Sequence, residues 1–276
     1  MNNFKKVSIV ITSFNRGVLL ERAIESAISQ TYQNIEIIIV DDCSSDTKTI
    51  EILKKFDNKN KYSNIKIFIL EKNKGANYCR NVGINKSTGY FYTGLDDDDY
   101  FSKDRVQFLI DNYHDKYGFI CTNYLLVNGK KNKKRFIGPK TLKKNSLFKI
   151  NNAGNQIFTT IDKIKSVNCF DTNLKRLQDQ DMWIRLLKKY KIAKRFNKAN
   201  YIMDIDHCFN RITKNNNEFQ SYYTLYRKHK SEMDLSSRRY NMLRLIYLKK
   251  SKIPFKYFSL SPIYFFKITL KTKLKR

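Results

Sequence analysis

The sequence lacks the features that place a chain across a membrane or send it out of the cell. It has no apolar run of about 18 residues, the length that a membrane-spanning helix needs. Residues 1–6 (MNNFKK) lead straight into a strand-like segment, without the apolar stretch and cleavage site of a signal peptide. We therefore expect a cytoplasmic protein.

The sequence also lacks paired cysteines. It has 5 cysteines, and no two of them form a CxxC pair. They are Cys43, Cys79, Cys121, Cys169 and Cys208. An odd number of widely spaced cysteines argues against a zinc site or a disulfide framework, so we expect reduced thiols.

Acidic residues are scarce, at 25 Asp and Glu against 54 Lys and Arg, which gives a net charge of +29. Residues 130–149 hold nine basic side chains and no acid, and residues 215–276 hold fifteen against three acids. This excess favours an anionic partner, namely nucleic acid, anionic lipid or a phosphorylated substrate.

Against this background, four consecutive aspartates, Asp96–Asp99, are out of character. Adjacent carboxylates repel one another unless a positive charge offsets them. A hard divalent cation binds oxygen ligands, and Mg²⁺ commonly takes one or two carboxylates together with substrate phosphates. The run therefore indicates a metal and phosphate site, or else a solvated acidic turn that favours the start of a helix near residues 103–113.

The first hundred residues alternate between strand-like and helix-like segments. This order predicts a mainly parallel sheet covered by helices on both faces, an α/β fold. The expected strands are residues 7–12, 35–40, 65–70 and 90–95, and the expected helices are residues 18–30, 47–56 and 77–85.

Polar residues follow the expected strands where each one ends. Thr12–Asn15 follow the first, Asp41 and Asp42 the second, Glu71 the third and Asp96 the fourth. In open α/β sheets, ligands bind beyond the carboxyl ends of the strands. These side chains should converge, which favours the binding-site interpretation of the acidic run.

The alternation weakens after residue 114. We expect a strand at residues 119–127, a loop region at 128–156 and a helix at 178–190. Residues 215–276 are expected to form a basic, aromatic, helical extension. The domain division is therefore 1–214 and 215–276.

Six motifs in this order resemble the family 2 glycosyltransferases, an inverting group with the GT-A fold. The resemblance covers roughly residues 6–211. The motifs are VSIVITSFNR (7–16), SQTY (29–32), VDDCSSD (40–46), KGANYCRNVGINKSTG (74–89), LDDDD (95–99) and QDQDMWIRL (178–186).

The resemblance implies a nucleotide pocket. Asp42 would accept a hydrogen bond from the uracil imide, and Thr12 and Asn15 would line the same pocket. The alternative for residues 41–46 is a turn that caps the next helix, and for Thr12 and Asn15 it is ordinary strand-end polarity. Arg80 would contact the diphosphate or hold the acidic loop, unless it is a helix-surface arginine.

The resemblance also implies a metal ion. Asp96–Asp98 match the family's D-x-D signature, whose last aspartate binds Mn²⁺ or Mg²⁺ while the others contact ribose or metal-bound water. We expect Asp98 as the first ligand, then Asp96 and then Asp97, with Asp99 supporting the loop. The cation would neutralise the departing nucleoside diphosphate.

Asp179 matches the aspartate of the family's E-D motif, which is the general base that deprotonates the acceptor hydroxyl. Gln178 replaces the glutamate that usually precedes it. The alternative for Asp179 and Asp181 is a pair of first-turn acids that stabilise a helix, and for Asp181 we favour that structural role. Late in the chain, His207 and Arg211 are candidate diphosphate or metal contacts.

The C-terminal extension, rich in cations and aromatics, suits an anionic membrane surface. Its alternatives are a helical cover or a homodimer contact; nucleic acid is disfavoured because no recognition motif is present. We expect a peripheral enzyme at the inner face of the cell membrane. It would transfer a hexose or N-acetylhexosamine from a UDP-sugar to a lipid-linked saccharide, for surface polysaccharide or lipopolysaccharide. The other classes weighed are a nucleotidyltransferase and a non-catalytic membrane adaptor.

Overall fold

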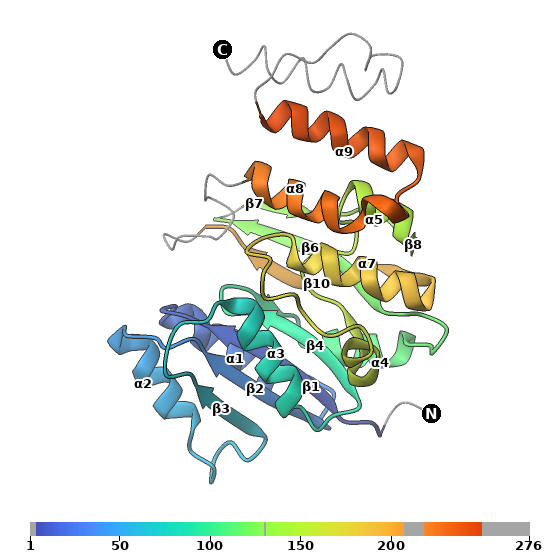
Figure 1. Ribbon diagram of the computed structural model, residues 1–276. Helices are drawn as coiled ribbons and strands as arrows, with labels where there is room; N and C mark the ends of the chain where they lie inside the picture. The colour runs from blue at the N-terminus through green and yellow to red at the C-terminus, as the bar shows by residue number, and fades with distance from the viewer. Residues whose placement is uncertain (1–3, 130, 207–217, 250–276) are drawn as a thin grey trace.

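The computed structural model describes residues 4–129, 131–206 and 218–249 (Figure 1). Strands and helices alternate through its N-terminal half, as the sequence predicts. The elements are β1 (Val7–Ser13), α1 (Val18–Ile28), β2 (Ile35–Asp41), α2 (Thr47–Phe56), β3 (Ile65–Ile69), α3 (Ala76–Lys86) and β4 (Phe91–Asp96).

The first four strands are parallel, in the order β3-β2-β1-β4. All residues of β1 and β2 are buried, because helices cover both faces of the sheet. Ile9 and Ile11 pack with α1, α2 and α4 (Arg105–Asn112), whereas Val10 packs on the opposite face with α3. Successive strand side chains point to opposite faces, so a continuous apolar run serves two cores.

The second half of the sheet is mixed rather than parallel. From β4 the order continues through β9 (Phe158–Thr160), β6 (Ile120–Asn128), β10 (Ile192–Asp204) and β5 (Tyr100–Phe101). The β9 strand is antiparallel to β4 and β6, and β5 is antiparallel to β10, while β6 and β10 are parallel. The expected parallel arrangement therefore holds for the N-terminal half of an otherwise mixed α/β sheet.

The loop expected at residues 128–156 was wrong in part. This segment contains β7 (Lys131–Lys134), β8 (Lys140–Lys143) and α5 (Lys144–Lys149). The two strands have little apolar alternation of their own; they form because their backbones pair with β6 and β10. Leu142, Leu147 and Phe148 are buried and anchor the segment to the core.

Helix α7 (Gln178–Tyr190) has the predicted bounds, and it follows the short α6 (Ile161–Lys165). The C-terminal part is helical, as expected, through α8 (Glu218–His229), a 3-10 turn at Lys230–Glu232 and α9 (Leu235–Leu248). These helices stack beyond α5 and α7 in Figure 1, and buried Asn241 of α9 donates to the Phe148 carbonyl of α5. Within the described ranges, no helix combines the length and apolarity needed to cross a membrane. Residues 250–276 lie outside the described residues.

Candidate functional site

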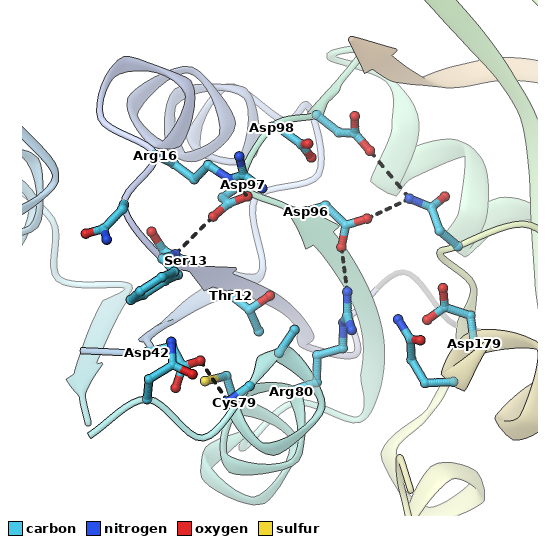
Figure 2. A pocket seen from close by; sticks show the side chains of 18 of the residues that line it. Thr12, Ser13, Arg16, Asp42, Cys79, Arg80, Asp96, Asp97, Asp98 and Asp179 are labelled. Atoms are coloured by element: carbon cyan, nitrogen blue, oxygen red, sulfur yellow. Dashed lines mark hydrogen bonds and ion pairs between the residues drawn. The ribbon is translucent and has the colours of Figure 1, made fainter. Parts of the chain in front are cut away.

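A cleft of about 680 Å³ opens at the carboxyl ends of β1, β2 and β4. Pairing places Thr12 beside Asp96 and Ser13 beside Asp41, so the strand ends converge as predicted. The described site residues proposed from the sequence all line this cleft: Thr12, Asn15, Asp42, Arg80, Asp96, Asp97, Asp98 and Asp179. In Figure 2, Asp42 and Asp179 lie on opposite sides, with Arg80 and Asp96 between them. His207 and Arg211 lie outside the described residues.

The buried carboxylate of Asp42 accepts hydrogen bonds from the backbone N–H groups of Lys74 (2.7 Å) and Gly75 (2.8 Å). Gly75 has φ +86°, a conformation that glycine adopts without strain and that turns its N–H toward the acid. Asp46 instead caps α2, accepting from the N–H groups of Lys48 and Thr49. The capping interpretation of the DDCSSD motif therefore holds for Asp46, while Asp42 lines the cleft and its role toward a nucleotide stays a prediction.

Asn15 joins two loops at the rim of the cleft. Its backbone has φ 51°, and its side-chain oxygen accepts from the N–H groups of Ser45 (2.9 Å) and Asp46 (3.1 Å). Thr12 is buried and also lines the cleft. The Asn15 side chain therefore holds the shape of the pocket, in addition to lining it.

The first two aspartates of the acidic run are held by different partners. Asp96 accepts from Arg80 (3.0 Å) and Gln156 (2.8 Å) at one oxygen, and from Asn155 (2.6 Å) at the other. Asp97 accepts from the Arg16 side chain and the Phe14 N–H, both at 3.2 Å. Burial raises the pKa of Asp97 to about 8, although Arg16 opposes this shift.

The last two aspartates also differ. Asp99 is buried and accepts from the Tyr201 hydroxyl (2.8 Å) and the Asp204 N–H (3.2 Å), so it ties the loop to β10. The Asp98 backbone oxygen accepts from Arg22 (2.8 Å), which also pairs with Asp204, while the Asp98 residue lines the cleft. This clamp fixes the backbone position from which Asp98 extends.

The carboxylates of this loop are oxygen donors of the kind that a hard cation binds. The described residues hold no group of three or more His, Cys, Asp or Glu arranged as a protein-only metal cage. A cation that also binds phosphates needs only one or two carboxylates. Both Asp96 oxygens already accept hydrogen bonds from protein donors. Asp98 lines the same cleft, and the resemblance places it first among the expected ligands.

Asp179 occupies the first turn of α7, where the helix dipole favours a negative charge. The preceding Leu177 has φ 62°, an unfavourable backbone conformation for leucine that places the helix start beside the cleft. One Asp179 oxygen, Oδ1, is buried without a hydrogen-bond partner among the described residues. Burial raises the pKa of Asp179 to about 7, with Arg80 opposing the shift and Asp96 adding to it. A carboxyl with such a pKa can exchange protons near neutral pH.

Asp181 is not among the residues that line the cleft. Its fully buried carboxylate contacts Arg185 (2.8 Å), Lys228 (2.9 Å) and His229 (2.8 Å). Trp183 is likewise buried and donates to the Gly154 carbonyl (2.7 Å). These contacts are structural, as we expected for Asp181.

Sequence reasoning missed several residues of the site. Asn155 and Gln156 fall in the segment that we took for a loop, and no periodic pattern singles them out. Phe14 and Arg16 belong to the first motif, which we used only for Thr12 and Asn15. The Phe14 side chain lines the cleft and is 44% exposed, which only the structure reveals.

The comparisons with known proteins agree with this geometry. Residues 8–173 match the sequence pattern of glycosyl transferase family 2. The chain is 31% identical to glycosyl transferase WcaA of Escherichia coli K12, a protein assigned to colanic acid biosynthesis, over 92% of this chain and 91% of the relative. It is 29% identical to WfgD of Escherichia coli, a UDP-Glc:alpha-D-GlcNAc-diphosphoundecaprenol beta-1,3-glucosyltransferase, over 68% of this chain and 72% of that protein.

The fold also matches a solved structure. The S. aureus TarS fragment 1–349, determined in complex with UDP-GlcNAc, has a TM-score of 0.67 and 20% identity, covering 93% of this chain and 76% of that one. This likeness shows the GT-A architecture, a central sheet flanked by helices. The sequence match, which spans more than half of the residues and includes the cleft-lining strand ends, shows that the chain belongs to glycosyl transferase family 2.

Proposed function

We propose that the protein is an inverting transferase that moves a hexose or N-acetylhexosamine from a UDP-sugar to a lipid-linked saccharide. The product would serve surface polysaccharide or lipopolysaccharide biosynthesis. The names of relatives support this choice, because WfgD is named for UDP-Glc and a diphosphoundecaprenol acceptor, and WcaA for colanic acid. The enzyme would work at the inner face of the cell membrane, where such acceptors present their saccharides.

One observation carries the proposal. The Asp179 carboxylate, with an oxygen that has no described partner, shares one cleft with Asp42 and Asp98. Asp42 and the exposed Phe14 ring would hold the nucleotide base, the ring by stacking. Asp98, with Asp96 as the second expected ligand, would hold a Mn²⁺ or Mg²⁺ ion, which offsets the charge of the diphosphate when bound.

The chain's own groups then account for the transfer. Asp179 takes the proton of an acceptor hydroxyl while the oxygen of that hydroxyl forms a bond to the anomeric carbon of the donor sugar. The bond from that carbon to the diphosphate oxygen breaks, and the nucleoside diphosphate leaves from the opposite face. A single displacement inverts the anomeric configuration. Arg80 holds Asp96 in place at 3.0 Å beside this path.

Three buried oxygens that line the cleft support an uncharged, hydroxyl-rich acceptor. The side-chain oxygens of Asn155 and Gln178, like Oδ1 of Asp179, are buried without a hydrogen-bond partner among the described residues. Asn155 cannot easily rotate its amide, since its nitrogen donates to Asp96. Unpartnered buried acceptors are costly unless a ligand or water satisfies them. Sugar hydroxyls supply the missing donors.

A panel of UDP-, GDP- and dTDP-sugars, each with and without Mn²⁺, tests this function through thermal stabilisation and transfer. We expect the largest Mn²⁺-dependent shift with a UDP-sugar, together with transfer to an undecaprenyl-diphosphate-linked saccharide. Stabilisation by another nucleotide class alone would contradict the donor. Donor binding without transfer to any lipid-linked saccharide tested would contradict the acceptor.

A further inference from the structure

The β7–β8 segment, residues 131–143, carries a cluster of positive charge with no nearby acid in sequence. No Asp or Glu occurs between Asp115 and Asp162. We refer to residues 131–143 as the basic ribbon. Its exposed cations are Lys133, Lys134, Arg135, Lys140 and Lys143, and none of them forms an ion pair with a described residue. The charge is therefore available to an outside partner.

The link between β7 and β8, which pair with β6 and β10 and not with each other, presents an aliphatic side chain to solvent. Ile137 is 89% exposed, while its neighbour Phe136 is half-buried against Tyr124 and the Arg195 guanidinium. Phe136 anchors the link between β7 and β8, and Gly138 follows in this link with φ +71°. A single exposed isoleucine is unremarkable on its own. Here it stands between basic residues on both sides, the pattern of an interfacial anchor.

One end of the basic ribbon begins beside the active-site cleft. In the sheet, Leu126 of β6 pairs with Met203 of β10, and Met203 lines the cleft. The next residue, Val127, pairs with Asp204 on one side and with Asn132 of β7 on the other. The strand β7 therefore starts at the same edge of the sheet as the cleft (Figure 1), whereas β8 pairs with residues 192–195 at the opposite end of β10.

We propose that the basic ribbon is a docking surface for an anionic lipid bilayer. Its lysines and arginine would contact the head groups, while Ile137 enters the boundary with the acyl chains. In one respect this rests on the proposed function: a lipid-linked acceptor needs the cleft close to the bilayer, and the ribbon starts beside the cleft. A nucleic acid would also match the charge, but its phosphates would make no favourable contact with the exposed aliphatic side chain of Ile137.

The test uses the full-length chain and sedimentation with phosphatidylcholine vesicles, with and without phosphatidylglycerol, in the absence of nucleotide sugar. The ribbon variant is Lys133→Gln/Lys134→Gln/Lys140→Gln. The matched control is Lys54→Gln/Lys61→Gln/Lys103→Gln, which removes the same charge from other exposed positions. A second pair is Ile137→Ser against Ile69→Ser, the latter 65% exposed at the end of β3.

We expect the ribbon variant to bind anionic vesicles on the order of 100-fold more weakly, since three cations leave the surface, and the lysine control to bind like the wild type. Ile137→Ser should weaken binding even at high salt, where charge attraction is screened, and Ile69→Ser should not. Equal losses in the ribbon variant and its control would overturn the proposal. So would ribbon-dependent binding to a single-stranded oligonucleotide that exceeds binding to the vesicles.

Catalysis is measured separately, as hydrolysis of a soluble UDP-sugar without vesicles. We expect this activity to be the same in the wild type, the ribbon variant and the control. Loss of vesicle binding with normal donor hydrolysis supports the docking surface. A chain that binds vesicles through the ribbon but uses no nucleotide sugar would contradict the proposed function while leaving the docking surface intact.

Discussion

The carboxylate of Asp181 on α7 lies 2.8 Å from Nε2 of His229 on α8, and both side chains are buried. Arg185 and Lys228 also pair with this carboxylate. Asp179, the candidate base, is two residues away on the same helix. Helix α8 is therefore attached to the start of α7, which carries this candidate base, through a cluster of charged side chains.

Asp181→Asn should destabilise the protein by about 3 kcal/mol, because half-buried Arg185 and buried His229 lose the carboxylate that they contact, whereas Lys228 keeps Asp171. His229→Ala should cost less, about 1–3 kcal/mol, because Asp181 keeps Arg185 and Lys228. Urea denaturation of each variant measures these losses. The exposed Lys189→Gln serves as the control, and equal stability of Asp181→Asn and the wild type would show that the cluster adds nothing.

The same cluster predicts sensitivity to acid. Burial would raise the pKa of Asp181, but hydrogen bonds from His229 and Lys228 and the charge of Arg185 hold it at about 2, below its ordinary value of 3.8. This contribution to stability is complete above about pH 4 and is lost as the pH falls toward 2. Asp181→Asn should therefore show a smaller loss of stability than the wild type over this window, as measured by melting temperature against pH.

Asp179→Asn should lower the transfer rate by at least about 10³-fold, since the variant cannot take the acceptor proton. Its folded state should be no less stable than the wild type at pH 8. Burial raises the pKa of Asp179 to about 7, so the wild type loses stability as the pH rises from about 4 to 7, and asparagine removes that loss. Unchanged binding of the UDP-sugar would separate loss of the base from loss of the site. Full transfer activity in this variant would exclude Asp179 as the base.

The pH profile tests the environment of the same carboxyl. The rate should rise with pH through a midpoint near 7 as Asp179 loses its proton. Gln178→Glu, which restores the family's usual residue, places a second acid next to Asp179 and should move this midpoint to higher pH. The measurement is kcat/KM between pH 5 and 9, with Gln178→Ala as the uncharged control. A midpoint that stays in place would mean that the Gln178 side chain does not face the base.

The sequence predicted most of the N-terminal half because apolar runs and helical spacing are local signals. Helices α2 and α7 match their expected bounds, and Asp42 and Asp96 reach one cleft because parallel strands end at one edge. The segment around β7 and β8 could not be predicted in this way. The strand β8 depends on backbone pairing with β10, which lies far away in the sequence. The strand β7 is close to its partner β6, but its residues (KNKK) show no apolar alternation.

The sequence also could not predict which partners hold each aspartate of the acidic run. Four identical residues have four environments: Arg80, Arg16 and Tyr201 donate to the carboxylates of Asp96, Asp97 and Asp99, and Arg22 donates to the backbone oxygen of Asp98. The resemblance implies a cation at this loop, but only the structure shows that both Asp96 oxygens accept hydrogen bonds from protein donors. Asn155 supplies one of those donors from a segment with no motif.

The expected order of metal ligands, Asp98 before Asp96, predicts the outcome of metal-binding experiments. Asp98→Asn should remove most of the Mn²⁺-dependent part of the thermal stabilisation by UDP, because the cation loses the first of its two expected carboxylate ligands. The melting temperature of Asp98→Asn without nucleotide serves as the control for folding, since Arg22 still holds the backbone oxygen of residue 98. Asp96→Asn should instead lower the melting temperature without any ligand, because Arg80, 10% exposed at its side chain, loses its ion pair. EDTA should stop transfer by the wild type, and added Mn²⁺ or Mg²⁺ should restore it. The reverse pattern, with metal-dependent stabilisation lost in Asp96→Asn and kept in Asp98→Asn, would make Asp96 the principal ligand and require Arg80 to release it when the donor binds.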